Sequence, residues 1–531
     1  MLKFLRLSSA YLLFTYCGLD AQEIVWEKSY GGKSADYLSS VTPTPDYGFI
    51  VGGSSLSNKS GSKAENNNGN LDYWVWKINE KGDLMWQKNF GGAGSDFLRS
   101  VSLTKDGGFM LGGVSSSDRS FDKKEDSRGL TDFWLIKQDA SGSEQWQKTI
   151  GGSGQEKIQT VMQALDGGYI VGGSSDSPIS GEKTDAGMGN LDLWIVKLDS
   201  KGVIQWQKTY GGIYIDELRS LATTTDGGYI VGGYSNSPAS ICKSENSRSG
   251  DFWILKLDKD GSIIWEKTLG GDGDDQLQVV SQTYDGGYVV AGSSNSGSSG
   301  QKTVGNSSGT DFWVLKLDHD GVSIWQKSFN YGRIDVLRSL IENEDHSFIL
   351  GGFSQGNAVG RSTKKVIAAK SETGTDDFIA LKISEDGEEL WSRVIGSDGE
   401  DILNDAIEMR GGSYLLAGTS NGKSSRDRNS NVGSSDFWLV KLDDKSKPKK
   451  EPLPIEAFPN PAVMYTNIII GYDFSSGTAT LVDISGHILQ QFPIYQRTVP
   501  INMQPYADGI YIVNIHTDVQ DSGIKIIKTS K

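Results

Sequence analysis

A Trp-containing segment recurs along this chain at intervals of about 60 residues. In each copy the Trp is followed two positions later by Lys or Arg, and the copies lie at Trp26, Trp86, Trp146, Trp206, Trp265, Trp325 and Trp391. A second series, Asp-aromatic-Trp, recurs between them, as at Asp132-Phe133-Trp134. A fixed period of this length indicates one supersecondary unit that is used repeatedly and stacked on its neighbours.

Each unit reads as four short β-strands, which in the first unit we expect at 37–44, 48–56, 72–79 and 84–91. Asp- and Gly-containing turns separate the first two strands and the last two strands, which is typical of hairpins. The third strand is an almost unbroken apolar run, as at 133–136, and such a run indicates a strand covered on both faces. The second strand carries Gly pairs such as Gly172-Gly173, which indicate a bulge or a close backbone approach.

Four-stranded units repeated radially form a β-propeller, and seven copies of each strand predict seven blades. The repeats begin with the Trp strand at 24–31 and end with an Asp-Phe-Trp strand at 436–442. The N-terminal strand is therefore expected to complete the last blade, and this closure removes an open sheet edge. The predicted fold class is all-β, a seven-bladed β-propeller over residues 22–443 followed by a small β-sandwich. An open array of separate sheets is the alternative, and the offset ends of the repeat argue against it.

The first 21 residues have the pattern of a secretory signal peptide. Lys3 and Arg6 precede a short apolar stretch at 7–16, and Ala21 is a small residue before the expected cleavage point. A lipoprotein anchored through Cys17 is the alternative. No segment is apolar for long enough to predict a transmembrane helix. The mature chain would retain only Cys242, so we expect no intramolecular disulfide.

Composition changes after the repeats, where residues 444–454 are charged and Pro-rich and predict a linker. Residues 455–531 then form a short β-patterned domain, whose distinctive residues are Phe458, Pro459, Asn460, Pro461, Asp483, Gly486, Gly509 and Tyr511. This domain resembles the type A C-terminal sorting domain of the type IX secretion system of Bacteroidetes. The resemblance implies a small β-sandwich, the type IX secretion machinery as a partner, and a secreted or outer cell-surface location. An ordinary accessory β-sandwich is the alternative.

The formal net charge is −15, from 52 Lys and Arg against 67 Asp and Glu. This excess of negative charge argues against a nucleic acid partner and against an anionic membrane surface.

An acidic residue recurs at one position of the loop that precedes each first strand. The seven residues are Asp36, Asp96, Glu156, Asp216, Asp275, Asp335 and Asp401. Placed at equivalent positions around a propeller, they would form an acidic ring near the central channel that could bind a cation such as calcium, a basic peptide or sugar hydroxyls. The alternative is that each carboxylate caps backbone N–H groups of its own turn.

Further candidates lie on the same face. The loops between the second and third strands are long and polar, as at 57–71, and serve either as binding loops or as solvated spacers. Blade six departs from the repeat, and its loop at 355–376 carries several basic residues. Tyr214 and Tyr331 are expected to face solvent there, where an aromatic ring can stack on a sugar.

Signals of catalysis are weak. The four His residues are scattered without metal-ligand spacing, and we nominate no catalytic residue, no metal and no cofactor, with calcium left open. The preferred interpretation is a secreted or cell-surface binding or adhesion protein whose propeller face binds a glycan or a protein. The alternatives are a carbohydrate-active hydrolase or lyase and a structural surface protein.

Overall fold

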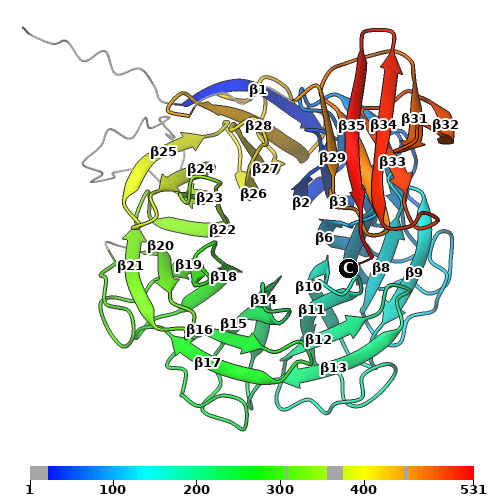
Figure 1. Ribbon diagram of the computed structural model, residues 1–531. Helices are drawn as coiled ribbons and strands as arrows, with labels where there is room; N and C mark the ends of the chain where they lie inside the picture. The colour runs from blue at the N-terminus through cyan, green and yellow to red at the C-terminus, as the bar shows by residue number, and fades with distance from the viewer. Residues whose placement is uncertain (1–21, 307–308, 356–374, 448–452, 531) are drawn as a thin grey trace, which may run out of the picture.

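The computed structural model describes residues 22–306, 309–355, 375–447 and 453–530. Seven four-stranded antiparallel sheets surround a central opening, and two further sheets, of three and four strands, follow them in the chain (Figure 1). The predicted fold class is confirmed: the chain is a seven-bladed β-propeller followed by a small β-sandwich. Within the described ranges the regular structure consists of strands alone.

The strands of each blade are numbered here from one, next to the central opening, to four, at the outer edge. Blade one contains β2 (Asp36–Pro43), β3 (Phe49–Ser55), β4 (Asp72–Ile78) and β5 (Leu84–Phe90). Blade two contains β6 (Asp96–Leu103), β7 (Phe109–Ser115), β8 (Asp132–Gln138) and β9 (Glu144–Ile150). Blade three contains β10 (Glu156–Gln163), β11 (Tyr169–Ser175), β12 (Asp192–Leu198) and β13 (Ile204–Tyr210).

The next three blades repeat this order. Blade four contains β14 (Asp216–Thr223), β15 (Tyr229–Ser235), β16 (Asp251–Leu257) and β17 (Ile263–Leu269). Blade five contains β18 (Asp275–Gln282), β19 (Tyr288–Ser294), β20 (Asp311–Leu317) and β21 (Ser323–Phe329). Blade six contains β22 (Ile334–Glu342), β23 (Phe348–Gln355), β24 (Asp376–Ile383) and β25 (Glu389–Ile395).

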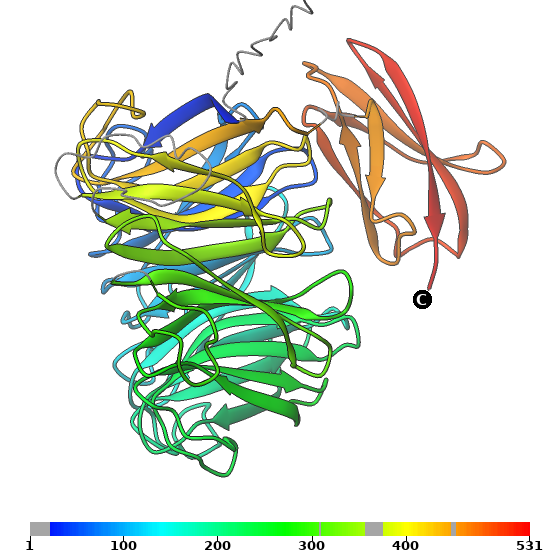
Figure 2. The ribbon, with the colours of Figure 1, turned by 90° about the vertical axis from the view of Figure 1, so that its left-hand side faces the viewer.

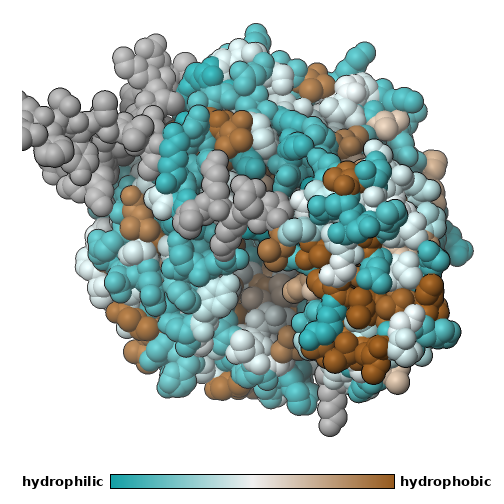
Figure 3. Space-filling view, turned by 45° about the horizontal axis from the view of Figure 1, so that its top comes forward, coloured by the Kyte–Doolittle hydropathy of each residue, from teal (hydrophilic) through white to brown (hydrophobic). Residues whose placement is uncertain are grey.

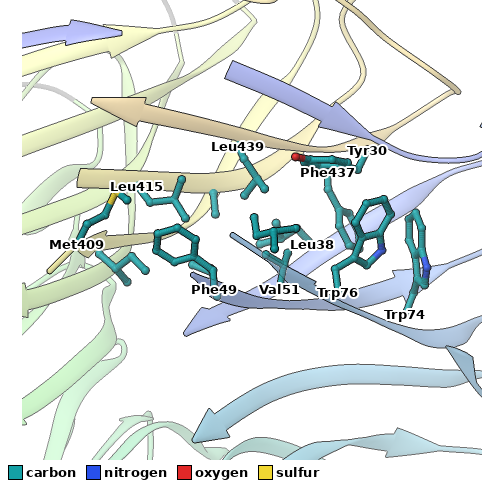
Figure 4. Close-up of a cluster of buried hydrophobic side chains, with 14 residues drawn as sticks. Tyr30, Leu38, Phe49, Val51, Trp74, Trp76, Met409, Leu415, Phe437 and Leu439 are labelled. Carbon is teal, nitrogen blue, oxygen red and sulfur yellow. The ribbon is translucent and has the colours of Figure 1, made fainter. Parts of the chain in front are cut away.

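Blade seven joins the two ends of the propeller. It contains β26 (Asp401–Glu408), β27 (Tyr414–Ser420), β28 (Asp436–Asp444) and, as its outer strand, β1 (Gln22–Tyr30). β1 pairs with β28 in antiparallel register, as the offset of the repeat predicted. A hydrophobic cluster behind this junction combines Tyr30, Trp74 and Trp76 with Leu415 and Phe437 of blade seven (Figure 4).

The recurring aromatic residues explain how successive blades pack. In six of the seven copies, the Trp of the Trp-x-Lys/Arg strand lies edge-on against the aromatic residue that begins strand two of the next blade. The ring centroids of Trp146 and Tyr169 are 5.6 Å apart, and those of Trp391 and Tyr414 are 5.7 Å apart. Such pairs stabilise a contact beyond the area that they bury. The repeat period therefore reflects a contact that has to form between neighbouring blades.

The Gly pairs lie at close approaches between strands one and two. In blade three the register of β10 and β11 shifts between Ile158 and Thr160, so strand one is bulged at this point. A Cβ on Gly173 would overlap the backbone carbonyl oxygen of Lys157. The bulge itself lies on strand one, and the glycine faces it from strand two.

The C-terminal residues form a sandwich of two sheets beside the propeller (Figure 2). One sheet contains β29 (Ile455–Phe458), β30 (Tyr465–Ile470) and β33 (Thr498–Asn502). The other contains β32 (Ile488–Ile494), β31 (Gly477–Asp483), β34 (Gly509–Thr517) and β35 (Asp521–Lys528). Ile468, Leu481 and Val513 belong to the apolar core between the sheets.

Candidate functional site

The two faces of the propeller carry different structures. One face carries the loops from strand four to strand one and from strand two to strand three, such as 91–95 and 56–71, and we call it the loop face. The opposite face carries the short turns between strands one and two and between strands three and four, such as 44–48 and 79–83, and we call it the turn face.

The C-terminal sandwich contacts the turn face. Glu456 accepts a hydrogen bond from the Tyr47 hydroxyl over 2.6 Å and forms an ion pair with Arg410. The Arg410 guanidinium lies 4.5 Å from the centre of the Tyr47 ring. A cavity of about 340 Å³ separates the two domains beside these contacts, lined by residues such as Asp46, Trp86 and Thr498. The loop face carries none of these contacts.

The seven residues of the predicted acidic ring occupy equivalent positions at the start of each strand one, and every one of them is buried. The exposed fraction is 0% for Asp36, Asp96, Glu156, Asp216, Asp275, Asp335 and Asp401. They do not line the channel surface. The structure brings them to one level of the propeller and directs each into its own turn.

The contacts of these carboxylates are local. Asp36 accepts hydrogen bonds from the Gly32 backbone N–H over 2.6 Å and from the Ser57 hydroxyl over 3.1 Å. Asp96 accepts the same two kinds of bond from Gly92 and Ser117, over 2.6 and 3.0 Å. Each carboxylate thus connects the loop that precedes its strand one to the start of the long loop that follows strand two of the same blade. These contacts support the alternative in which each acid caps its own turn.

Burial also changes the proton affinity of these acids. It raises the pKa of both Asp335 and Asp401 to about 6, against hydrogen bonds that lower it. The acid that begins strand three of the preceding blade adds to the effect, as Asp377 does for Asp401. Proton binding at these positions is therefore linked to folding.

The long loops between strands two and three are held by a second repeated residue, which the sequence interpretation missed. A basic side chain in each described loop is at most 2% exposed, and the set is Lys63, Lys123, Lys183, Lys243, Lys302 and Arg428. Lys183 donates to the Thr209 hydroxyl over 2.7 Å and lies 5.5 Å from the centre of the Trp194 ring. The signal was a Ser three positions before each basic residue, as at Ser180. The basic loop of blade six falls mostly outside the described residues.

Of the two Tyr residues that were expected to face solvent, one does so. Tyr214 is 50% exposed on the loop face. Tyr331 is only 2% exposed, so the expectation that it faces solvent was wrong. Its ring packs against Phe312, and its backbone N–H donates to Asp335 over 2.7 Å. Tyr331 has replaced a Gly of the repeat and turned its side chain into the blade.

The loop-face end of the central channel is hollow. A cavity of about 310 Å³ lies there between blades seven, one and two, lined by Tyr37, Ser39, Phe97, Arg99, Glu400, Asn404, Thr419 and Asn421 among others. Tyr37 is 39% exposed. Figure 3 shows the hollow of the channel at the centre of the ring, seen from the turn-face side. The cavity combines an exposed aromatic ring, a cation and several amide and hydroxyl groups, which is the composition of a site for a polar ligand.

The distinctive residues of the C-terminal domain have mainly structural contacts. Asn460 donates to the Lys525 carbonyl oxygen over 2.8 Å and accepts from the Ile527 N–H over 2.9 Å, which ties the chain to β35. Asp483 accepts from the His487 N–H over 3.0 Å across a turn that contains Gly486 at φ +81°. The Tyr511 hydroxyl donates to the Ala507 carbonyl oxygen over 2.8 Å. Phe458, by contrast, is 58% exposed.

Residues 456–529 match the family of secretion system C-terminal sorting domains. This chain is a type IX secretion cargo. The sorting domain directs export to the secreted or cell-surface state, so the expected export route is confirmed. Within the described ranges, no helix has the length and apolar character that crossing a membrane requires.

The chain also shows weaker similarity to other proteins. A segment of 232 residues is 24% identical to the regulatory protein FlaEY of Caulobacter vibrioides and covers 41% of the cargo and 24% of that protein. The cargo therefore spans about a quarter of the length of this relative. Sqt1 from Chaetomium thermophilum has a TM-score of 0.40 and 10% identity, covering 78% of the cargo and 99% of the Sqt1 chain. The WD40 domain of Neurospora crassa Pan2 has a TM-score of 0.30 and 11% identity, covering 61% and 88%.

Proposed function

We propose that the propeller is the ligand-binding part of this exported protein and that it binds a glycan at the loop-face end of the central channel. The observation that carries the proposal is the cavity of about 310 Å³ at this end of the channel, with Tyr37 exposed in its wall. An aromatic ring beside amide and hydroxyl groups suits the alternating apolar and polar surfaces of a sugar.

The position of the sorting domain supports this choice of face. Its contacts with Tyr47 and Arg410 occupy the turn face, whereas the cavity opens on the loop face. The cargo can therefore present the channel to a ligand while the sorting domain remains attached. A protein ligand is the second candidate for the same face.

The burial of the repeated acids favours binding over hydrolysis or lyase chemistry. A glycosidase needs two carboxyl groups about 5–10 Å apart in a cleft that its substrate can enter. The seven repeated acids are turned into their own loops, so none of them meets this requirement. Among the described residues, no three His, Cys, Asp or Glu side chains are grouped closely enough to hold a metal ion.

Thermal unfolding of the full chain against a panel of polysaccharides, with and without calcium, tests the proposal. A ligand at 100 times its Kd adds about 2.7 kcal/mol to the free energy of unfolding, which is readily measured. Tyr37→Ala should abolish the shift. Tyr284→Ala is the matched control, because Tyr284 is 67% exposed on the turn face. No shift with any polysaccharide, or the same loss in both variants, would contradict the proposal.

A further inference from the structure

Three arginines occupy one structural position in alternating blades. The sequence Leu-Arg-Ser recurs in strand one of blades two, four and six, at 98–100, 218–220 and 337–339. In each of these strands the register with strand two shifts across the Arg, so the Arg is the residue that the bulge leaves unpaired. Bulges redirect a side chain and are over-represented beside functional sites.

The bulge directs these arginines into the channel. In blade two Leu98 is 0% exposed inside the blade, and Ser100 accepts a hydrogen bond from the Val161 N–H of the next blade over 3.2 Å. Arg99, between them, is exposed and lines the cavity at the loop-face end. Blades four and six repeat the bulge at Arg219, which is half-buried, and at Arg338, which is exposed. Figure 1 shows β6, β14 and β22 among the strands that border the central opening.

The three guanidinium groups lie near enough to repel one another. Arg99 and Arg338 are exposed to the channel, but the channel walls around them still remove part of their hydration. This desolvation lowers the pKa of Arg99, and the charge of Arg219 lowers it further. Desolvation likewise lowers the pKa of Arg338, with further contributions from Arg219 and Arg99. The three arginines, from three separate blades, therefore interact electrostatically.

Nearby carboxylates balance only part of this positive charge. Glu217 pairs with Arg219 over 2.9 Å, and Glu400 lies in the wall of the same cavity. Within the described ranges neither Arg99 nor Arg338 forms an ion pair, and the buried Nε of Arg219 has no hydrogen-bond partner. The chain as a whole has a net charge of −15, so acids are abundant elsewhere. Three cations with only Glu217 and Glu400 beside them leave an excess of positive charge in the channel, which an anion would stabilise.

We propose that this channel holds the carboxylate or sulfate group of an acidic glycan, bound by Arg99, Arg219 and Arg338. A guanidinium presents a planar fork of N–H donors that matches the oxygens of these groups. The Arg99 guanidinium lies 4.4 Å from the centre of the Phe97 ring, and Tyr37 lines the same cavity. These two rings offer surfaces for the sugar that carries the anion. The inference rests on the proposed function, because it names the ligand chemistry of the same channel.

Calorimetric titration of the full chain tests this inference with glucuronate oligosaccharides, a sulfated oligosaccharide and a neutral glucose oligosaccharide of equal length. We expect both acidic probes to bind at least about tenfold more tightly than the neutral one, with an affinity that falls as salt is added. Free sulfate at low ionic strength should compete with them. Arg219→Gln should weaken acidic binding at least about tenfold, because a charge-assisted contact is lost.

Two variants separate binding from folding. Gln278 occupies the same bulge position in blade five without a charge, so Gln278→Ala should leave the affinity for acidic probes unchanged. Arg219→Lys keeps the charge but loses the fork, and should bind with intermediate affinity. Because Arg219→Gln removes a charge that repels Arg99 and Arg338, its Tm without ligand should not fall.

The outcomes distinguish this inference from the function on which it rests. Equal binding of the acidic and neutral probes would overturn the inference and leave glycan binding intact. Binding of no probe would overturn both. Equal loss of affinity in Arg219→Gln and Gln278→Ala would overturn the role of the arginines. Tighter binding of a glutamate-rich peptide than of either acidic sugar would overturn the assignment to a glycan.

Discussion

Trp438, in the last strand of the propeller, donates its indole N–H to the carboxylate of Glu27 in the first strand over 2.8 Å. The two residues are 411 positions apart in the chain. In blades one to four the equivalent Trp donates to a side chain of its own fourth strand, as Trp134 does to Gln147 and Trp194 to Gln207, both over 3.0 Å. Glu27 therefore supplies from the N-terminus what these four blades supply locally.

This relationship makes Glu27→Ala a test of closure. The substitution leaves the buried indole N–H of Trp438 without a partner, which should lower the free energy of unfolding by about 1–3 kcal/mol. Glu27→Gln reproduces the acceptor of blades one to three and should change the free energy of unfolding by less than about 0.5 kcal/mol. Glu23→Ala is the control on the same strand, because the Glu23 side chain is 64% exposed. Chemical denaturation measures all three, and equal stability of the two Ala variants would contradict the prediction.

The two glycines of a pair are expected to differ in how much stability is lost when each is replaced by Ala. Gly173→Ala should destabilise the fold by about 1–3 kcal/mol, because its Cβ would overlap a backbone carbonyl oxygen that cannot move without disturbing the bulge. Gly172→Ala should cost less, because Ala291 and Ala417 occupy the equivalent position in blades five and seven. Thermal unfolding of the two variants gives the comparison. A larger loss in Gly172→Ala would show that the carbonyl contact is not the constraint.

The buried acids predict that mild acid stabilises this protein. Burial raises the pKa of Asp335, Asp401 and Asp405 from 3.8 to about 6. Between these two values the folded state binds more protons than the unfolded chain, so the free energy of unfolding falls as the pH rises through this window. Each pKa unit corresponds to about 1.4 kcal/mol. Asp226 and Asp285 have their pKa lowered to about 2, so their contribution is lost only at lower pH.

Asp405→Ser isolates one of these acids. Asp405 accepts the Val41 N–H of blade one over 3.2 Å, and Ser339 accepts the Ala406 N–H in the same way over 2.8 Å. The Ser variant should therefore keep the contact between blades and flatten the pH profile between about 4 and 6. Denaturation measured across this range decides the point. Stability that rises with pH in the window, or an unchanged slope in the variant, would refute the assignment.

The buried lysines are expected to hold the long loops between strands two and three in an ordered conformation. Lys183→Ala should raise the hydrogen exchange of residues 176–190, because it removes the bond to Thr209 and the cation over the Trp194 ring. Lys183→Arg should preserve the order, since Arg428 serves at the equivalent position of blade seven. Lys201→Ala, in an exposed turn, is the control. Unchanged exchange in Lys183→Ala would mean that the loop is ordered by other contacts.

Much of the architecture was predictable because it depends on contacts that recur. The Trp period places pairs such as Trp146 and Tyr169 at six of the seven junctions between blades, so the regular sequence predicts a regular packing of blade on blade. The offset between the first and last repeats predicted that β1 completes blade seven. The prediction that Tyr331 faces solvent was wrong because a Tyr at this position occurs in one blade only, so the repeat pattern gives no information on its burial. Its burial depends on the contact with Phe312.

By itself, the sequence determined the number of blades, the closure and the export route, since each is encoded in a period or in a local motif. The tertiary structure alone decided which polar side chains are buried in turns and which lie at the bulges of the channel strands. Asp216 and Arg219 are three positions apart on one strand, yet the carboxylate is buried in its turn and Arg219 lies unpaired at the bulge. The physical reason is the bulge at Arg219, which breaks the alternation of side chains along the strand and which only pairing with the neighbouring strand creates.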